Sequence, residues 1–98
     1  MSLEQHTQAL RERVGEDCGL EATLKLDMGD AGVILIDATS VPNVVSNDDN
    51  EAQCTVKMTE QTLAELLTGD LAATTAFISG KLAIDGDMGV ALKLQDLM

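Results

Sequence analysis

The chain has 98 residues, enough for one domain, and hydrophobic residues make up 45% of it, as in ordinary globular proteins. Its 6 basic and 17 acidic residues give a formal net charge of −11, which repels nucleic-acid phosphates and anionic membrane surfaces alike. Phe77 is the only aromatic residue, so the aromatic platforms on which nucleic-acid bases stack are missing. We therefore expect a single domain over residues 1–98 with no nucleic-acid partner.

Signals for a metal site or a membrane span are weak. Cys18 and Cys54 are widely separated and the one histidine, His6, stands near the N-terminus, so we expect no metal and no cofactor. The ordinary expectation is a surface histidine and two reduced thiols, with Cys54 buried because it lies in an alternating strand. The sequence shows no leader-like segment and no apolar run of about 18 residues, which predicts a soluble, cytoplasmic protein that does not insert into membranes.

The first half of the chain predicts one helix followed by four strands. Ser2 and Gln5 match a capping box at the start of the helix, and Gly15 ends it. Alternation of apolar and polar residues predicts strands at 20–28 and 52–58. A glycine-containing turn then leads into the apolar run at 33–36, which predicts a strand covered on both faces. The weaker strand at 41–45 is expected at an edge of the sheet, because its proline has no backbone N–H to donate.

The second half of the chain predicts three helices and a fifth strand. Thr59 suits an N-cap, and Gly69 stands where a helix ends in a left-handed glycine. Asp70 is expected to cap a short second helix, and residues 81–84 are expected to form the fifth strand. A turn at 85–87 then caps the final helix. Strands in the first half and helices in the second predict an α+β fold, in which helices cover one face of a largely antiparallel sheet.

The final helix is apolar on two neighbouring faces, which is more than contact with a sheet requires. The first face consists of Met88, Ala91, Leu92 and Gln95. The second face consists of Val90, Leu94, Leu97 and Met98. A chain of this length has little core to cover so broad a surface. We therefore expect an apolar ligand or a partner to meet this helix.

Residues arranged for catalysis are missing from the sequence. The single histidine has no evident nucleophile or orienting carboxylate, and the glycines follow neither the dinucleotide-binding nor the P-loop spacing. In so acidic a chain, any chosen pair of carboxylates is uninformative. We therefore expect no enzymatic activity.

A series of short motifs in the second half follows the order found in one known family. The motifs are Cys54-Thr55-Val56-Lys57-Met58, Leu66-Leu67-Thr68-Gly69, Ala76-Phe77, Gly80-Lys81-Leu82, Ile84, Gly86, Met88-Gly89 and Ala91-Leu92-Lys93-Leu94-Gln95. Residues 52–97 thereby resemble the sterol carrier protein-2 domain, and the run at 80–97 is the most specific part. The resemblance implies a five-stranded sheet whose helices enclose an apolar tunnel for fatty acyl chains, sterols or similar lipids. It also implies that the domain itself has no catalytic activity.

The candidate ligand-binding residues are the apolar side chains of the last three helices and the fifth strand, together with one polar side chain. They are Leu63, Leu66, Leu67, Leu71, Phe77, Ile78, Leu82, Ile84, Met88, Leu92 and Gln95. Periodicity alone favours plain core packing for the apolar members. The resemblance adds contact with a lipid as an equal alternative for Phe77, Ile78, Met88 and Leu92. Gln95 is expected to orient the polar head of that lipid.

Two functions from different classes follow from this sequence. The first is a non-catalytic lipid carrier that works as a monomer or a weak dimer. The second is a protein-interaction module whose apolar C-terminal helix docks on a second copy or on another partner. A lipid that copurifies with the protein favours the first function, and a stable dimer that hides the final helix favours the second.

Overall fold

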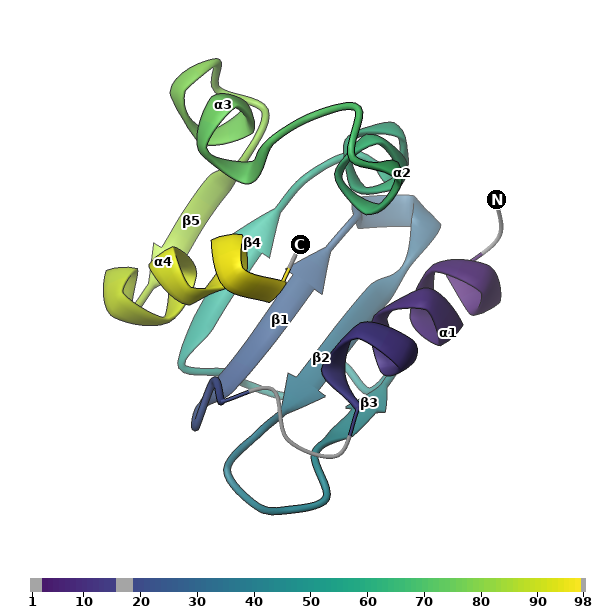
Figure 1. Ribbon diagram of the computed structural model, residues 1–98, viewed down its shortest axis with the longest axis vertical. Coiled ribbons are helices and arrows are strands. Elements are labelled where there is room, and N and C mark those ends of the chain that lie inside the picture. Colours follow the sequence, from purple (N-terminus) through teal and green to yellow (C-terminus); the bar gives the residue numbers. More distant parts are fainter. Residues whose placement is uncertain (1–2, 16–18, 98) are drawn as a thin grey trace.

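The computed structural model describes residues 3–15 and 19–97, with side chains described as far as residue 94. Over this part of the chain, helices lie above one face of a five-stranded sheet (Figure 1). In chain order the elements are α1 (Leu3–Val14), β1 (Thr23–Asp27), η1 (Gly29–Ala31, a 3₁₀-helix), β2 (Val33–Asp37), β3 (Val44–Ser46), β4 (Cys54–Lys57), α2 (Glu60–Thr68), α3 (Ala73–Ile78), β5 (Ala83–Gly86) and α4 (Met88–Leu97).

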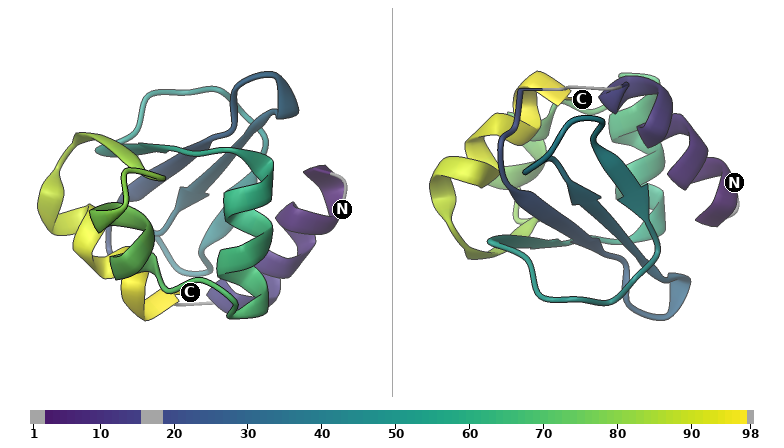
Figure 2. Two further views of the ribbon diagram at one scale, coloured as in Figure 1. Left: turned by 90° about the horizontal axis from the view of Figure 1, so that it is seen from above. Right: turned by 90° about the horizontal axis from the view of Figure 1, so that it is seen from below.

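The sheet has the strand order β3-β2-β1-β4-β5. Strands β1 and β4 pair in parallel, and the other three neighbouring pairs are antiparallel. The views from above and below show the helices gathered on one side of the strands (Figure 2). The predicted α+β class and the largely antiparallel sheet are therefore confirmed. The strand that follows Pro42 lies at an edge, as predicted, although it begins only at Val44.

Alternation along the strands builds the core between the sheet and the helices. The side chains on the helix-covered face that are fully buried are Leu24, Leu26, Ile34, Ile36, Cys54 and Val56. Their neighbours along β1, such as Lys25, point the other way and stay partly exposed. Leu35 is also buried although it faces away from the helices, so β2 is covered on both faces as its continuous apolar run predicts.

The helix ends follow local chemistry. The Thr59 hydroxyl accepts a hydrogen bond from the Thr62 backbone N–H at 3.1 Å, which confirms the predicted N-cap of α2. Gly69 ends α2 with a φ of 85°, a conformation that glycine adopts without steric cost. The carboxylate of Asp87 accepts from the Gly89 N–H at 2.8 Å and caps the start of α4. The prediction that Asp70 caps α3 is wrong, because α3 begins later and Ala72 occupies the N-cap position.

Two further expectations concern the N-terminal helix and the thiols. His6 is fully buried, with its Nε2 3.5 Å from Oε1 of Glu60, so the expectation of a surface histidine is wrong. The α1 face that carries Leu10 packs into the core and takes the histidine with it. Cys54 is a buried free thiol, as predicted. The proposed cap at Ser2 and the thiol of Cys18 lie outside the described residues.

Candidate functional site

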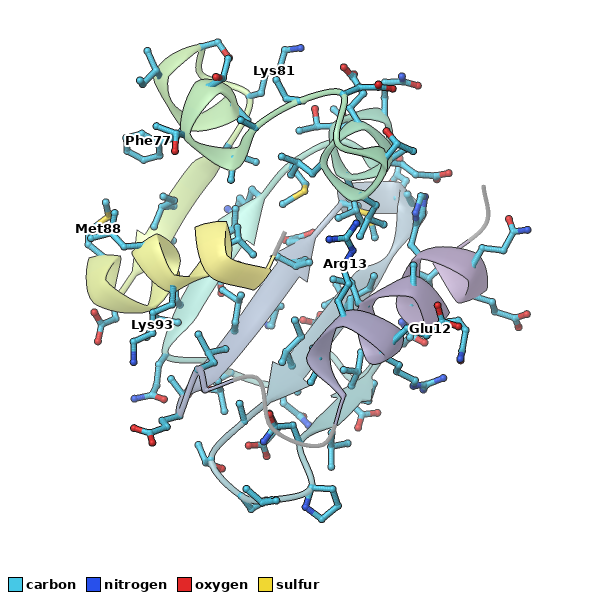
Figure 3. All side chains as sticks on the ribbon, in the orientation of Figure 1. Glu12, Arg13, Phe77, Lys81, Met88 and Lys93 are labelled. Carbon is cyan, nitrogen blue, oxygen red and sulfur yellow. The ribbon has the colours of Figure 1, made fainter. Side chains whose placement is uncertain are left out.

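An apolar pocket of about 140 Å³ lies between α3, β5 and α4. It is lined by Ala73, Thr74, Phe77, Leu82, Ile84, Met88, Ala91, Leu92 and Leu94. None of these residues is charged, and Thr74 supplies the only side-chain hydroxyl in the lining. Figure 3 shows Phe77 of α3 and Met88 of α4 at the same edge of the molecule. The pocket therefore suits an apolar group that enters between the two helices.

The two apolar faces of α4 have different surroundings. Val90 and Leu94 of the second face, together with Ala91 of the first, are at most 6% exposed and hold the helix against the sheet. Met88 and Leu92 are 47% and 60% exposed, and both line the pocket. Only part of the apolar surface of α4 is thus covered by the protein itself. The exposed part corresponds to the apolar surface beyond what contact with the sheet requires, which the sequence indicates.

Helix α3 forms the opposite wall of the pocket and is weakly anchored. It has six residues, of which Ala76 is the one that is buried. No side chain caps its N-terminus. Phe77 is 45% exposed although it lines the pocket, and Ile78 on the next position is 79% exposed. A short helix with so little buried surface is held by few contacts.

A second hollow of about 450 Å³ adjoins the first at the start of α3. It shares Ala73 and Thr74 with the apolar pocket and is otherwise lined by Arg13 and by the segment from α2 to α3. The Arg13 guanidinium donates a hydrogen bond to the backbone carbonyl of Leu67. Figure 3 shows Arg13 reaching from α1 toward α2 over the helix-covered face of the sheet. The second hollow therefore has a positive charge at its rim.

The predicted ligand-binding residues fall into four groups. Phe77, Leu82, Ile84, Met88 and Leu92 line the apolar pocket. Leu66, Leu67 and Leu71 line the second hollow. Leu63 is fully buried core and Ile78 is exposed outside both spaces. Gln95 belongs to α4, but its side chain lies outside the described part of the chain.

Two kinds of lining residue are absent from the candidate ligand-binding residues given above. Ala73 and Ala91 are small, and a small residue gives no hydrophobic signal that separates a pocket wall from a packed helix. Arg13 reaches the second hollow across a separation of 54 residues, which only the fold brings together. Lys81 and Lys93 are the two cations closest in sequence to the pocket residues, and Lys93 donates to the backbone carbonyl of Leu20 at 3.2 Å.

The thiol of Cys54 lies in β4, which pairs with β5. Burial raises the pKa of the Cys54 thiol, and the carboxylates of Asp87 and Asp85 raise it further, so the sulfur stays neutral.

Among the described residues, no three His, Cys, Asp or Glu side chains gather as a metal would require. None of the described helices is long and apolar enough to cross a membrane.

Comparison with known proteins agrees with this architecture. Residues 3–98 match the model of the SCP-2 sterol transfer family. The chain belongs to this family. Sterol carrier protein 2 of Bos taurus is 47% identical over 55 residues, which are 56% of this chain and 10% of the bovine protein. Hydroxysteroid dehydrogenase-like protein 2 of Danio rerio is 36% identical over 70 residues, 69% of this chain and 17% of that protein. The chain thus spans a small part of the curated relatives that it matches.

Solved structures of this family share the fold. Sterol Carrier Protein 2 Like 2 from Aedes aegypti superposes with a TM-score of 0.76 at 21% identity, covering 100% of this chain and 97% of that one. The palmitated form of that insect protein superposes with a TM-score of 0.74 at 21% identity, covering 99% and 94% of the two chains. At this level of identity the likeness shows the arrangement of helices and strands alone.

Proposed function

We propose that this chain is a non-catalytic lipid carrier that holds an acyl chain between α3, β5 and α4. The observation that supports this most directly is the uncharged pocket whose walls include the half-exposed side chains of Met88 and Leu92. Membership of the SCP-2 sterol transfer family supports a lipid as the ligand class. The apolar tunnel that the family resemblance implies would form from this pocket and the hollow beside it.

The size of the pocket favours a slim ligand. Its volume of about 140 Å³ is below the ~300–1,000 Å³ of most small-molecule sites. One end of a flexible acyl chain fits such a space better than the rigid rings of a sterol. The rest of the chain would extend toward the second hollow, which meets the pocket at Ala73 and Thr74. We therefore place an acyl chain ahead of a sterol.

Joining the two spaces requires the start of α3 to move. α3 is suited to this because it has one buried residue and no side-chain cap. α4, by contrast, is held by Val90, Ala91 and Leu94, and by the bond from Lys93 to Leu20. Mobile elements at binding sites come from the least stable parts of a fold. We expect α3 to open when an acyl chain binds, while α4 stays on the sheet.

The charges favour a ligand with a small head group. The apolar pocket has no charged lining residue, and the net charge of −11 repels a polyanion. Arg13 is the one basic residue that lines the second hollow, and it suits a single negative or polar group. We expect neutral lipids and simple fatty acids to bind better than acyl-CoA, whose phosphates need several basic partners.

Titration of delipidated protein with palmitate tests this proposal. Native mass spectrometry should show one bound palmitate. At a free concentration of ~100 times Kd, binding adds roughly 2.7 kcal/mol of stability, and a domain of this size should then melt roughly 10–20 °C higher. An unchanged melting temperature with palmitate, with cholesterol and with a monoacylglycerol, and no adduct by mass, would refute the proposal.

A second candidate function is favoured by the exposed apolar residues of α3 and α4. Phe77, Ile78, Met88 and Leu92 are at least 45% exposed, as an interaction module would require. A stable dimer in sedimentation experiments, with these residues protected from solvent and no lipid bound, would favour this reading. The cytoplasmic location, the weak or absent dimerisation and the absence of catalysis stay predictions.

A further inference from the structure

The sheet has two outer edges, and the edge at β3 is closed by a side chain. Arg11 of α1 donates two hydrogen bonds, from Nε and Nη2, to the backbone carbonyl of Val45, each at 3.1 Å. Val45 is the middle residue of the three that form β3. The guanidinium thus occupies the acceptor that the N–H of another strand would need. We therefore do not expect a further strand to add at β3.

The edge at β5 has backbone groups that are directed outward. The Asp87 N–H donates to the carbonyl of Gln53 at 2.9 Å, which makes these residues a hydrogen-bonded pair of the antiparallel ladder between β5 and β4. Bonded and non-bonded pairs alternate along such a ladder, so Asp85 is the next residue of β5 that bonds to β4. The N–H and C=O groups of Ile84 and Gly86 consequently point away from β4. No other strand in the described part of the chain lies beyond them.

The apolar pocket opens beside this edge. Phe77 of α3 and Met88 of α4 line the pocket together with Ile84, and they are 45% and 47% exposed. In Figure 1, β5 forms the left edge of the sheet, and Figure 3 shows both side chains projecting at that side. A strand added to β5 would place one side chain about 5 Å from Ile84 on the same face of the sheet. The pocket volume of about 140 Å³ suits one large apolar side chain there.

The charges at this edge favour a basic strand as its partner. Asp85 is exposed on the face of β5 opposite to Ile84, and Asp87 follows the end of the strand. The nearest cations in the sheet, Lys57 and Lys81, lie toward the start of β5. A second copy of the chain would bring the same carboxylates and another net charge of −11 to the edge. Like charges oppose strand pairing, whereas a lysine or arginine beside Asp85 stabilises it.

We infer that β5 is a docking site for an extended basic segment of another protein, which adds to the sheet as a further strand. The backbone of this segment bonds to Ile84 and Gly86. One of its apolar side chains enters the mouth of the pocket between Phe77 and Met88, and a basic side chain on its other face lies beside Asp85. In strand addition of this kind, the ladder supplies affinity and the alternate side chains supply specificity. The inference does not rest on the lipid-carrier function, because the ladder needs no lipid in the pocket.

A fluorescein-labelled peptide that alternates lysine and leucine tests the docking on delipidated protein. Its fluorescence anisotropy should rise when the wild-type protein is added. A second peptide has the same side chains but carries N-methyl groups on its central backbone amides, so it cannot donate to the ladder. It should bind at least about tenfold more weakly. With the first peptide bound, amide hydrogen exchange should slow at Ile84 and stay unchanged at Val45, on the closed edge.

Charge reversal at the edge tests the choice of partner. Asp85→Lys should weaken binding of the lysine–leucine peptide about fivefold, because a like charge replaces an opposite one across the strands. Asp48→Lys is the matched control, since it makes the same change at an exposed residue that follows β3 at the other edge. It should bind the peptide as the wild type does. A glutamate–leucine peptide should bind the Asp85→Lys variant better than the wild type.

The inference would be overturned by unchanged anisotropy with the wild-type protein, by equal binding of the N-methylated peptide, or by unchanged exchange at Ile84 with the peptide bound. Equal weakening by Asp85→Lys and Asp48→Lys would also overturn it, because it would show attraction to the whole acidic surface and not to β5. A dimer that Asp85→Lys strengthens would assign the edge to a second copy of the chain instead.

Discussion

Gly86 has a backbone and surroundings that should tolerate no side chain. It ends β5, pairs with Cys54 of β4 and has a φ of 114°. A Cβ atom there would lie 2.5 Å from the backbone carbonyl oxygen of Gln53. The positive φ costs about 1–2 kcal/mol for a residue with a Cβ, and overpacking adds about 1–3 kcal/mol. We therefore expect Gly86→Ala to lower the free energy of unfolding by about 3 kcal/mol, a large share of the ~5–15 kcal/mol of a typical domain.

Urea unfolding followed by circular dichroism measures this loss. Gly80→Ala is the matched control, because Gly80 also has a positive φ, 80°, but a Cβ there would meet no heavy atom within 4 Å. It should lose only about 1 kcal/mol, from the backbone conformation alone. Equal losses in the two variants would refute the reasoning, since they would mean that β5 shifts away from Gln53 at little cost. The β5–β4 pairing would then be too loose to fix the wall of the pocket.

Three further predictions follow from single side chains. Ala91→Leu places extra carbon atoms in the apolar pocket and should weaken palmitate binding, measured by calorimetry, by at least about tenfold. Ala83→Leu makes the same change on the exposed side of β5 and should leave palmitate binding unchanged. Burial, followed by neighbouring carboxylates, raises the pKa of Cys54, so N-ethylmaleimide should modify this thiol slowly until urea unfolds the protein. The stability linked to this thiol should be lost as the pH rises above the ordinary thiol value; rapid modification of the folded protein would contradict its burial. Hydrogen bonds from the side chain and, to a smaller extent, the backbone of Thr39 lower the pKa of Asp37. The stability linked to Asp37 should therefore be present at neutral pH and lost in acid. In the Asp37→Asn variant, the urea concentration at the unfolding midpoint should change less with pH below the ordinary pKa of aspartate.

Local sequence chemistry predicts the elements of this fold well. The alternation in β1 and β4 places Leu24 and Val56 on the helix-covered face, and both are fully buried. The cap at Thr59 and the glycine at position 69 mark both ends of α2. The pattern does not tell whether a single residue is buried when its helix face carries few apolar residues. His6 lies four residues before Leu10 on the same face of α1 and is buried with it, although a polar residue gives no hydrophobic signal of its own.

The sequence pattern identifies the apolar residues of the candidate site but not what lies opposite each of them. Five of the large apolar residues that the spacing and the family resemblance single out line the pocket, and their contact with a ligand stays a prediction. Leu63 has the same spacing but packs in the core, and Ile78 has the same hydrophobicity but faces solvent. Periodicity separates apolar from polar faces of an element. Whether an apolar face is covered or left exposed depends on which other element lies opposite it. For Ile78 no described element lies opposite, and for Arg13 the opposing element is 54 residues away.

An acyl chain that occupies the space between α3, β5 and α4 must lie against the side chains that line it. Methyl-labelled protein mixed with ¹³C-depleted palmitate allows intermolecular nuclear Overhauser effects to be measured directly between ligand and side chains. We expect contacts from the acyl protons to the methyl groups of Leu82, Met88 and Leu92, which line the pocket. We expect none to Val44, which lies on the distant edge strand. Palmitate that binds without contacting the methyl groups of Leu82, Met88 and Leu92 would contradict binding in this pocket.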